Sequence, residues 1–462
     1  MKKLALAVVA TVIGLVMAEG VLRLTGLGII QPEIQFGEIT GARLESGLLI
    51  FDKDLFWREP EGVPDQIHLG NHFVRVGDVF PTKERRLRVL CLGDSCTRLS
   101  RTNQPFSVRL QAVLGPNAEV FNASLPGYTS HQGLAWLNKQ LLASNPDVVV
   151  VYFGWNDHWR SWGLPDRAYA RSLGFSSSRL LNLVRPRPAI PPIRMLPDEY
   201  RENLNEMARL ITGQGGKMVL VLAPHNINRE NTAHFRKNGS ITEGDDPQAL
   251  HLAYLEIARD AGAIPGVRLY AAAAQFAAID EPRLILQRDG IHPTDPGHQI
   301  LARSLADDIT RHDLGAPGPP ADPVAMGLSV LAQESSFSGE WETALRLFRR
   351  SVSVEPAGVG QRLGLAWLLA TCPEAALRDG AEALVLLEPV AGFAGQSAQF
   401  LDVQAAALAE TGRFEEATRA LDQALVFLSE QGGGQSEFAR SIRERQEGYR
   451  RGKAFRTPAP AG

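Results

Sequence analysis

Residues 86–95 read RLRVLCLGDS, a short apolar run that ends at Gly93, Asp94 and Ser95. A continuous apolar run of this length, closed by turn residues, is typical of a strand buried on both faces. Three more runs of this kind are AEVFNAS (118–124), DVVVVYFG (147–154) and KMVLVLAP (217–224). Segments with helical spacing alternate with them: 106–115, 131–144, 199–215, 248–262 and 298–312. This alternation predicts βαβ units, a parallel sheet and a three-layer α/β sandwich.

Two long insertions, 158–197 and 225–247, interrupt the alternation. Structureless loops of this length inside a compact domain are usually functional lids or disordered segments. We therefore expect both insertions to be loops that lie near a functional site.

The composition excludes several classes of protein. Hydrophobic residues make up 44% and charged residues 21% of the 462, with a net charge of −3. These values exclude a wholly disordered chain, a polytopic membrane protein and a basic nucleic-acid binder. The three cysteines, Cys91, Cys96 and Cys372, cannot build a disulfide framework or a four-cysteine zinc site.

The N-terminus departs from this average composition. Lys2 and Lys3 precede an uncharged run that ends at Ala18. This pattern fits a secretory signal peptide, while the apolar residues beyond Glu19 allow an uncleaved signal anchor within residues 1–30. A buried N-terminal helix is the third alternative. A signal peptide and a signal anchor would both place the rest of the chain outside the cytoplasm. In either case we expect membrane contact only through this segment. Residues 31–85 then form an N-terminal arm.

The last third of the chain has a different character. Residues 315–323 (GAPGPPADP) have the composition of a linker, and 324–450 are rich in Ala and Leu at helical spacing. GEWETALRLF (339–348) aligns without gaps with GRFEEATRAL (412–421), which resembles the tetratricopeptide repeat. Such an array presents a concave surface for a protein partner, although a generic helical bundle would share the pattern. We expect 451–462 to be a disordered tail.

Polar residues with catalytic chemistry follow the predicted strands. Ser95 stands at a strand-to-helix turn, where its hydroxyl would be exposed. A serine hydroxyl becomes nucleophilic when a base removes its proton, and a carboxylate can orient a histidine for that task. Asp289 and His292, three residues apart before the last helix, can supply both groups.

Two further turns can stabilise negative charge. Gly127 ends NASLPG (122–127), and Asn156 lies in GWND (154–157). The Ser95 N–H, the Gly127 N–H and the Asn156 side-chain amide would together form a three-donor oxyanion hole. We expect the adjoining Asp94 and Asp157 to brace their turns.

These four blocks resemble those of the SGNH hydrolases, a branch of the GDSL esterase/lipase superfamily. They are GDS (93–95), NASLPG (122–127), GWND (154–157) and DGIH (289–292). The resemblance implies a flavodoxin-like SGNH hydrolase domain over 86–314. It also implies that Ser95, Asp289 and His292 are catalytic and that Ser95, Gly127 and Asn156 form the oxyanion hole.

Some neighbouring residues invite other interpretations. Trp155, His158 and Trp159 could line a substrate pocket. Cys96 follows the serine, but the next residue of a helix points elsewhere, so we do not expect a thiol nucleophile. No three residues have the spacing of a metal site, and no phosphate-binding glycine loop is present, so we expect no metal and no cofactor.

The sequence thus predicts a serine hydrolase that cleaves acyl or acetyl esters of carbohydrate or lipid through an acyl-serine intermediate. An O-acyltransferase that modifies a cell-surface polysaccharide would use the same residues and stays open. A non-enzymatic repeat scaffold is the second alternative.

Overall fold

The structure is a computed structural model of the 462-residue chain. It describes residues 2–25, 27, 49–60, 73–83, 87–161, 163–174, 178–184, 188–316, 320–395 and 397–459. The chain forms two compact units. Unit 1 comprises Met1–Ala274 and Ile285–Ala306, and unit 2 comprises Gln275–Leu284 and Asp307–Gly462. Much of the arm predicted over 31–85, the middle of the linker predicted over 315–323 and the last three residues lie outside the described residues.

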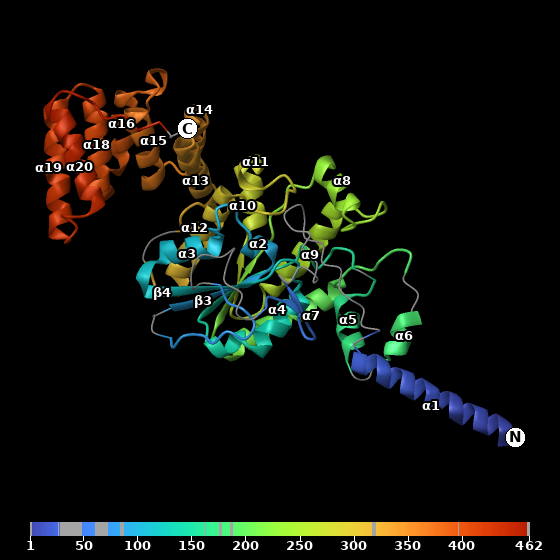
Figure 1. Cartoon of the computed structure of the whole chain (residues 1–462). Helices are drawn as coiled ribbons and strands as arrows, with labels where there is room; N and C mark the ends of the chain where they lie inside the picture. Colours follow the sequence, from blue (N-terminus) through green and yellow to red (C-terminus); the bar gives the residue numbers. More distant parts are fainter. Residues whose placement is uncertain are drawn as a thin grey trace. The chain divides into compact units, whose positions relative to one another are not determined.

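A five-stranded parallel sheet forms the centre of unit 1, in the order β4-β3-β5-β6-β7 (Figure 1). Its strands are β3 (Leu87–Gly93), β4 (Ala118–Ser124), β5 (Val148–Tyr152), β6 (Lys217–Val221) and β7 (Val267–Tyr270). Counted within the sheet, this is the flavodoxin-like order 2-1-3-4-5, whose switch point lies between its first and third strands. The α/β fold predicted from the sequence is confirmed.

The registers align the carboxyl ends of the three strands around this switch point. Gly93 pairs with Ser124 on one side and with Tyr152 on the other. Every residue of β3 and β5 is buried, as expected for central strands covered on both faces. The loops after β3, β4 and β5 therefore begin at one edge of the sheet, where a site would lie.

Helices cover both faces of the sheet (Figure 1). One face carries α3 (Phe106–Leu114) and the first part of α12 (Asp295–His312), and the other carries α4 (Ser130–Lys139), α7 (Pro197–Gly213) and α9 (Pro247–Ala261). The helix predicted over 131–144 ends early and continues as the 3-10 turn Leu141–Ser144, closed by Asn145 with φ 54°.

The structure corrects the expectation of two structureless insertions. Residues 158–197 contain α5 (Asp166–Leu173) and α6 (Arg179–Val184), and 225–247 contain α8 (Arg229–Lys237). α5 and α8 are short and rich in polar residues, so neither provides the long apolar stripe by which a helix is recognised in a sequence. The sequence also gave no sign of β7, of α10 (Ala272–Ile279) or of α11 (Pro282–Ile285).

Part of the arm packs against the sheet domain. Strands β1 (Ile50–Asp52) and β2 (Phe56–Arg58) form an antiparallel hairpin. Leu55, Phe56 and Trp57 at its tip are buried, and Gln132 of α4 donates its amide Nε2–H to the Leu55 carbonyl at 2.8 Å. This hairpin therefore belongs to the domain structurally, although the sequence placed it before the domain.

The N-terminal helix α1 (Lys2–Thr25) has no buried residue. Its length and its mean hydropathy of 2.3 are sufficient for crossing a membrane. The helix is compatible with a signal peptide or a membrane anchor.

Unit 2 is largely helical. Beyond α12 its helices are α13 (Pro323–Phe337), α14 (Trp341–Val354), α15 (Val359–Thr371), α16 (Gly380–Leu387), α17 (Ala391–Ala394), α18 (Ala398–Glu410), α19 (Phe414–Glu430) and α20 (Glu437–Arg450), with 3-10 turns at Ala375–Leu377 and Glu388–Val390. Packed partners include α13 with α14, and α18 with α19. The helical content agrees with the sequence, and the tetratricopeptide assignment stays a prediction.

The end of the chain differs from the disordered tail that we expected. Thr457 donates its backbone N–H to the Thr371 carbonyl at 2.8 Å. The Phe455 ring lies 5.8 Å from the Trp367 ring, and Arg456 pairs with Glu410. These contacts fix residues 455–457 against α15 and α18.

Candidate active site

Ser95 is the first residue of α2 (Ser95–Arg98), directly after β3. Asp94 caps this short helix, since its carboxylate Oδ1 accepts the Cys96 N–H at 2.9 Å. Gly93 must be a glycine, because an added Cβ would lie 2.1 Å from the Thr97 hydroxyl and 2.8 Å from the Tyr152 carbonyl. The tight turn leaves Ser95 partly exposed while its neighbours are buried.

The structure brings His292 and Asp289 to Ser95. His292 Nε2 lies 2.8 Å from Ser95 Oγ, and His292 Nδ1 lies 2.6 Å from Asp289 Oδ2. The other oxygen of Asp289 accepts the backbone N–H groups of Ile291 and His292, both at 3.0 Å. This Asx turn holds the carboxylate beside the imidazole of its own loop.

The charges around His292 determine which ring nitrogen carries the proton. Burial alone would raise the pKa of Asp289, but the charge and hydrogen bond of His292 and two backbone N–H donors lower it to about 2. The Asp289 carboxylate is therefore an acceptor only, so Nδ1 of the neutral ring carries the hydrogen and Nε2 can accept from Ser95. Burial would lower the pKa of His292, but Asp289 and then Asp94 raise it above its usual range.

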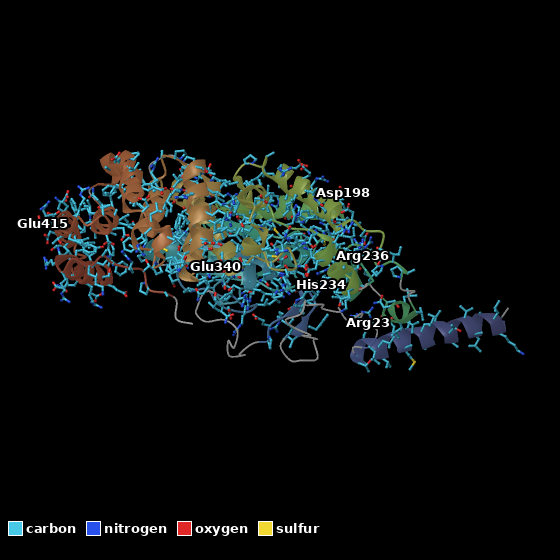
Figure 2. All side chains as sticks on the ribbon, turned by 90° about the horizontal axis from the view of Figure 1, so that it is seen from above. Arg23, Asp198, His234, Arg236, Glu340 and Glu415 are labelled. Atoms are coloured by element: carbon cyan, nitrogen blue, oxygen red, sulfur yellow. The ribbon has the colours of Figure 1, made fainter. Side chains whose placement is uncertain are left out.

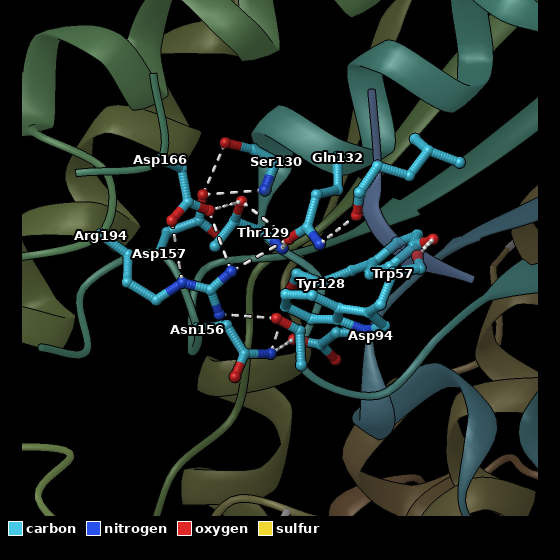
Figure 3. Close-up of polar contacts among 12 residues, drawn as sticks. Trp57, Asp94, Tyr128, Thr129, Ser130, Gln132, Asn156, Asp157, Asp166 and Arg194 are labelled. Atoms are coloured by element: carbon cyan, nitrogen blue, oxygen red, sulfur yellow. Dashed lines mark hydrogen bonds and ion pairs between the residues drawn. The ribbon is translucent and has the colours of Figure 1, made fainter. Parts of the chain in front are cut away.

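Gly127 and Asn156 end the neighbouring strand loops. Gly127 follows β4 in a turn with φ 80°, a conformation that favours glycine. Asn156 follows β5, and its Nδ2 donates to Asp94 Oδ2 at 3.0 Å and to the Tyr128 carbonyl at 3.1 Å (Figure 3). Both acceptors fix the amide orientation, because a flipped amide would place oxygen against oxygen. An oxyanion at this amide would share the N–H groups that Asn156 already donates to Asp94 and Tyr128.

The aspartates beside the site brace its turns, as expected. Asp157 Oδ1 accepts the Ser130 N–H at 2.9 Å and the Ser130 hydroxyl at 2.5 Å, and its Oδ2 accepts the Gly154 N–H at 3.1 Å. Burial raises the pKa of Asp157 to about 7 and that of Asp94 to about 6. These hydrogen bonds tie the loop after β5 to the start of α4.

The Cys96 side chain packs against the loop that carries Asp289 and His292. Its buried thiol lies 3.7 Å from the Ile291 carbonyl, and burial raises its pKa well above the usual range. A buried protonated thiol is a poor nucleophile, which agrees with the expectation from its position.

Trp155, His158 and Trp159 are buried in an aromatic cluster. The Trp155 ring stacks on His251 with centroids 3.8 Å apart, and on Trp159 with centroids 5.6 Å apart. His158 Nε2 lies 3.1 Å from His251 Nδ1, and His251 Nε2 donates to the Ala223 carbonyl at 3.0 Å. The cluster supports the loop that carries Asn156. A substrate-pocket role for these three residues stays a prediction.

Sequence reasoning missed a buried network behind Gly127 (Figure 3). Arg194 makes a two-pronged ion pair with Asp166, at 3.1 and 2.9 Å, and donates to the Gly127 carbonyl at 2.6 Å. Trp57 donates its indole N–H to the Pro126 carbonyl at 3.3 Å. Neither Trp57 nor Arg194 belongs to a recognisable motif, so no sequence signal pointed to them.

The comparison with known families decides the assignment. A family model described as GDSL-like Lipase/Acylhydrolase family matches residues 91–300. We refer to residues 91–300 as the GDSL domain because of this similarity. The similarity supports an ester hydrolase and not the non-enzymatic scaffold.

Several solved structures resemble this domain. The lipase/acylhydrolase from Enterococcus faecalis is 21% identical, covers 48% of this chain and 95% of its own, and has a TM-score of 0.34. The acetylxylan esterase Axe2 from Geobacillus stearothermophilus is 17% identical, with coverages of 49% and 94% and a TM-score of 0.35. The acetyl xylan esterase AlAXEase is 19% identical, with coverages of 48% and 100% and a TM-score of 0.35. No curated protein matches the chain.

Proposed function

We propose that the GDSL domain cleaves acyl esters of carbohydrate or lipid, acetyl esters included, through an acyl-enzyme on Ser95. The observation that carries this proposal is the continuous relay from Asp289 through His292 to Ser95, with contacts of 2.6 and 2.8 Å. The relay lies at the carboxyl end of β3, at the switch point of the sheet.

The relay gives each residue a separate role. His292 Nε2 takes the proton as Ser95 Oγ attacks the ester carbonyl, and Asp289 stabilises the imidazolium that forms. The protonated His292 then donates to the leaving alcohol oxygen, which completes acylation. A water molecule, deprotonated by the same Nε2, then attacks the acyl carbonyl. The bond to Ser95 Oγ breaks, His292 returns the proton to that oxygen, and the acid leaves.

The oxyanion of each tetrahedral intermediate would be stabilised by the backbone N–H groups of Ser95 and Gly127 and by the Asn156 amide. The Ser95 N–H belongs to the first turn of α2, where helical N–H groups favour negative charge. Asp94 and Tyr128 fix the orientation of the Asn156 amide, and the oxyanion would share one of the two N–H groups that bond to them.

An activity panel tests this function. Purified full-length protein is assayed with acetylated sugars and with short-chain and long-chain acyl esters, with Ser95→Ala as the control. The proposal predicts that the wild type cleaves one ester class and that Ser95→Ala cleaves none. Full activity of Ser95→Ala would contradict it.

The same panel separates hydrolysis from transfer. An acceptor sugar is added, and the products are analysed for free acid and for acylated acceptor. Free acid as the main product in the presence of acceptor supports the hydrolase, and stoichiometric acyl transfer supports the O-acyltransferase that the sequence left open. A protein partner for the helices of unit 2 stays a prediction.

We further propose that the GDSL domain lies outside the cytoplasm and is tethered by α1. The helix continues without a break through Ala18–Glu19, where a signal peptide that ends with the uncharged run would be cleaved, and carries Arg23 near its end (Figure 2). Glu19 accepts hydrogen bonds from the Ser178 hydroxyl at 2.9 Å and from the Arg179 N–H at 2.9 Å. These bonds join α1 to the start of α6, which supports a helix retained beside α6.

Mass spectrometry of the protein from membrane and soluble fractions tests the tether. A peptide that spans Ala18–Glu19, recovered from the membrane fraction, supports it. A new N-terminus at Glu19 in a soluble fraction would instead identify α1 as a cleaved signal peptide.

A further inference from the structure

The Gly127 loop has the hallmarks of a type II β-turn over Leu125–Tyr128. Pro126 and Gly127 occupy its two central positions, Gly127 has φ 80°, and the Tyr128 N–H donates to the Leu125 carbonyl at 3.2 Å. A type II turn requires positive φ at the third position and favours proline at the second.

The central peptide of this turn decides where the Gly127 N–H points. In a β-turn, type I and type II differ by a flip of the peptide between the two central residues, here Pro126–Gly127. Glycine at the third position can adopt both conformations. A flip would reverse both the Pro126 carbonyl and the Gly127 N–H, so an oxyanion donor on this turn needs an external restraint.

Three side chains from distant segments bind the consecutive carbonyls of this turn. Trp57 donates to the Pro126 carbonyl at 3.3 Å, Arg194 to the Gly127 carbonyl at 2.6 Å and Asn156 to the Tyr128 carbonyl at 3.1 Å. Trp57 comes from the β1–β2 hairpin, and Arg194 from the end of the first insertion.

Both external donors are themselves held rigidly. The Trp57 side chain is 1% exposed, its ring lies 5.7 Å from the Tyr128 ring, and its own carbonyl accepts the Tyr128 hydroxyl at 2.7 Å. Asp166, which is fully buried, grips the Arg194 guanidinium with both oxygens, and Gln132 Oε1 accepts from Arg194 Nη2 at 3.0 Å. The planar guanidinium fork suits this geometry, which an ammonium group could not reproduce.

We propose that Trp57 and Arg194 are positioning residues that hold the Pro126–Gly127–Tyr128 backbone so that the Gly127 N–H faces the reacting carbonyl oxygen. This proposal rests on the proposed esterase function. The Trp57 hydrogen bond opposes the peptide flip directly, since it holds the carbonyl of the same peptide. It also polarises that peptide, because an acceptor bond on the C=O strengthens the N–H as a donor.

The matched variants are Trp57→Phe and Trp136→Phe in the full chain. Both tryptophans are almost fully buried and lie edge-on to Tyr128, and both donate an indole N–H. Trp136, however, donates to the Gln140 side chain at 3.1 Å and has no bond to the turn. Each variant loses one indole N–H and keeps an aromatic ring, so the pair compares loss of the bond to Pro126 with loss of a bond outside the turn; the Arg194 guanidinium, 5.6 Å from the centre of the Trp57 ring, also keeps an aromatic partner in Trp57→Phe.

Steady-state kinetics on an activated acetyl ester and inhibition by a trifluoromethyl ketone give the readouts. Loss of a whole oxyanion donor costs about 10²–10³ in kcat, and a misplaced one costs up to about 10²-fold. We expect Trp57→Phe to lower kcat about 10- to 100-fold with KM little changed, and to raise the inhibition constant of the ketone in parallel. Trp136→Phe should leave both within about twofold, because it makes no contact with the oxyanion.

Equal kcat and equal ketone affinity in the two variants would overturn the positioning role. If Trp57→Phe fails to fold, Arg194→Lys carries the test, since it keeps the charge beside Asp166 and loses the fork. A folded Arg194→Lys with wild-type kcat and ketone affinity would overturn the proposal as well. Ser95→Ala is measured alongside: its activity would contradict the esterase function itself, whereas inactive Ser95→Ala with unaffected Trp57→Phe contradicts only the positioning role.

Discussion

Replacement of Asp289 by asparagine tests the relay without removing its scaffold. The asparagine oxygen can still accept the N–H groups of Ile291 and His292, which Asp289 Oδ1 accepts at 3.0 Å. Its amide nitrogen then faces His292 Nδ1 in place of Oδ2, which lies 2.6 Å from that nitrogen. An amide N–H can bond only to an unprotonated Nδ1, so the ring proton moves to Nε2. His292 then presents a donor to Ser95 and cannot act as its base.

The expected loss in kcat can be estimated from the contact between Asp289 and His292. A carboxylate and an imidazolium about 4 Å apart attract each other by about 4 kcal/mol at an effective dielectric constant of about 20. At 1.36 kcal/mol for each tenfold in rate, that is about a 10³-fold loss in kcat, and the wrong tautomer adds to it. The assay is steady-state hydrolysis of an activated acetyl ester, with thermal unfolding of both proteins to show that the fold is kept. An Asp289→Asn protein that folds and retains kcat within tenfold of the wild type would refute this reasoning.

Three further outcomes follow from the pKa shifts and hydrogen bonds of the site. Activity should fall as pH drops through the raised pKa of His292, since the imidazolium cannot take the serine proton; a pH–rate profile whose acidic limb lies well below pH 6.5 would contradict this. Asp157→Ala should lower the free energy of unfolding by about 3 kcal/mol in a denaturant titration, because it leaves buried donors of Ser130 and Gly154 without their acceptor. An unchanged titration midpoint would argue against that bracing. Cys96→Ala should keep kcat within about threefold, since its buried thiol takes no part in the relay. An inactive but folded variant would instead indicate that the Cys96 thiol takes part in catalysis.

The sequence predicted the parts of the site that depend on local order along the chain. The run at 86–95 is apolar because β3 is covered on both faces, so its buried strand and the exposed serine after it could be inferred together. Asp289 and His292 could be paired because three residues separate them on one turn. β7 escaped detection because it is short and only its first residue is buried, which leaves no continuous apolar run.

Long-range contacts could not be predicted in this way. Trp57 and Arg194 meet at Gly127 only because the β1–β2 hairpin and the end of the first insertion fold onto the same turn. Nothing in the residues around either position indicates that partner, since an indole N–H and a guanidinium can bond many carbonyls. The insertion was expected to be a loop near the site, and it is partly helical and supplies a buried ion pair behind it.

The central claim is that Ser95 is a nucleophile activated by His292, and covalent labelling tests it most directly. Full-length protein is treated with a fluorophosphonate, digested and analysed by mass spectrometry, with His292→Ala as the matched control. The account predicts one phosphonylated site, on the peptide that contains Ser95, in the wild type, and strongly reduced labelling in His292→Ala. Labelling of another serine, or equal labelling of Ser95 without the histidine, would contradict it.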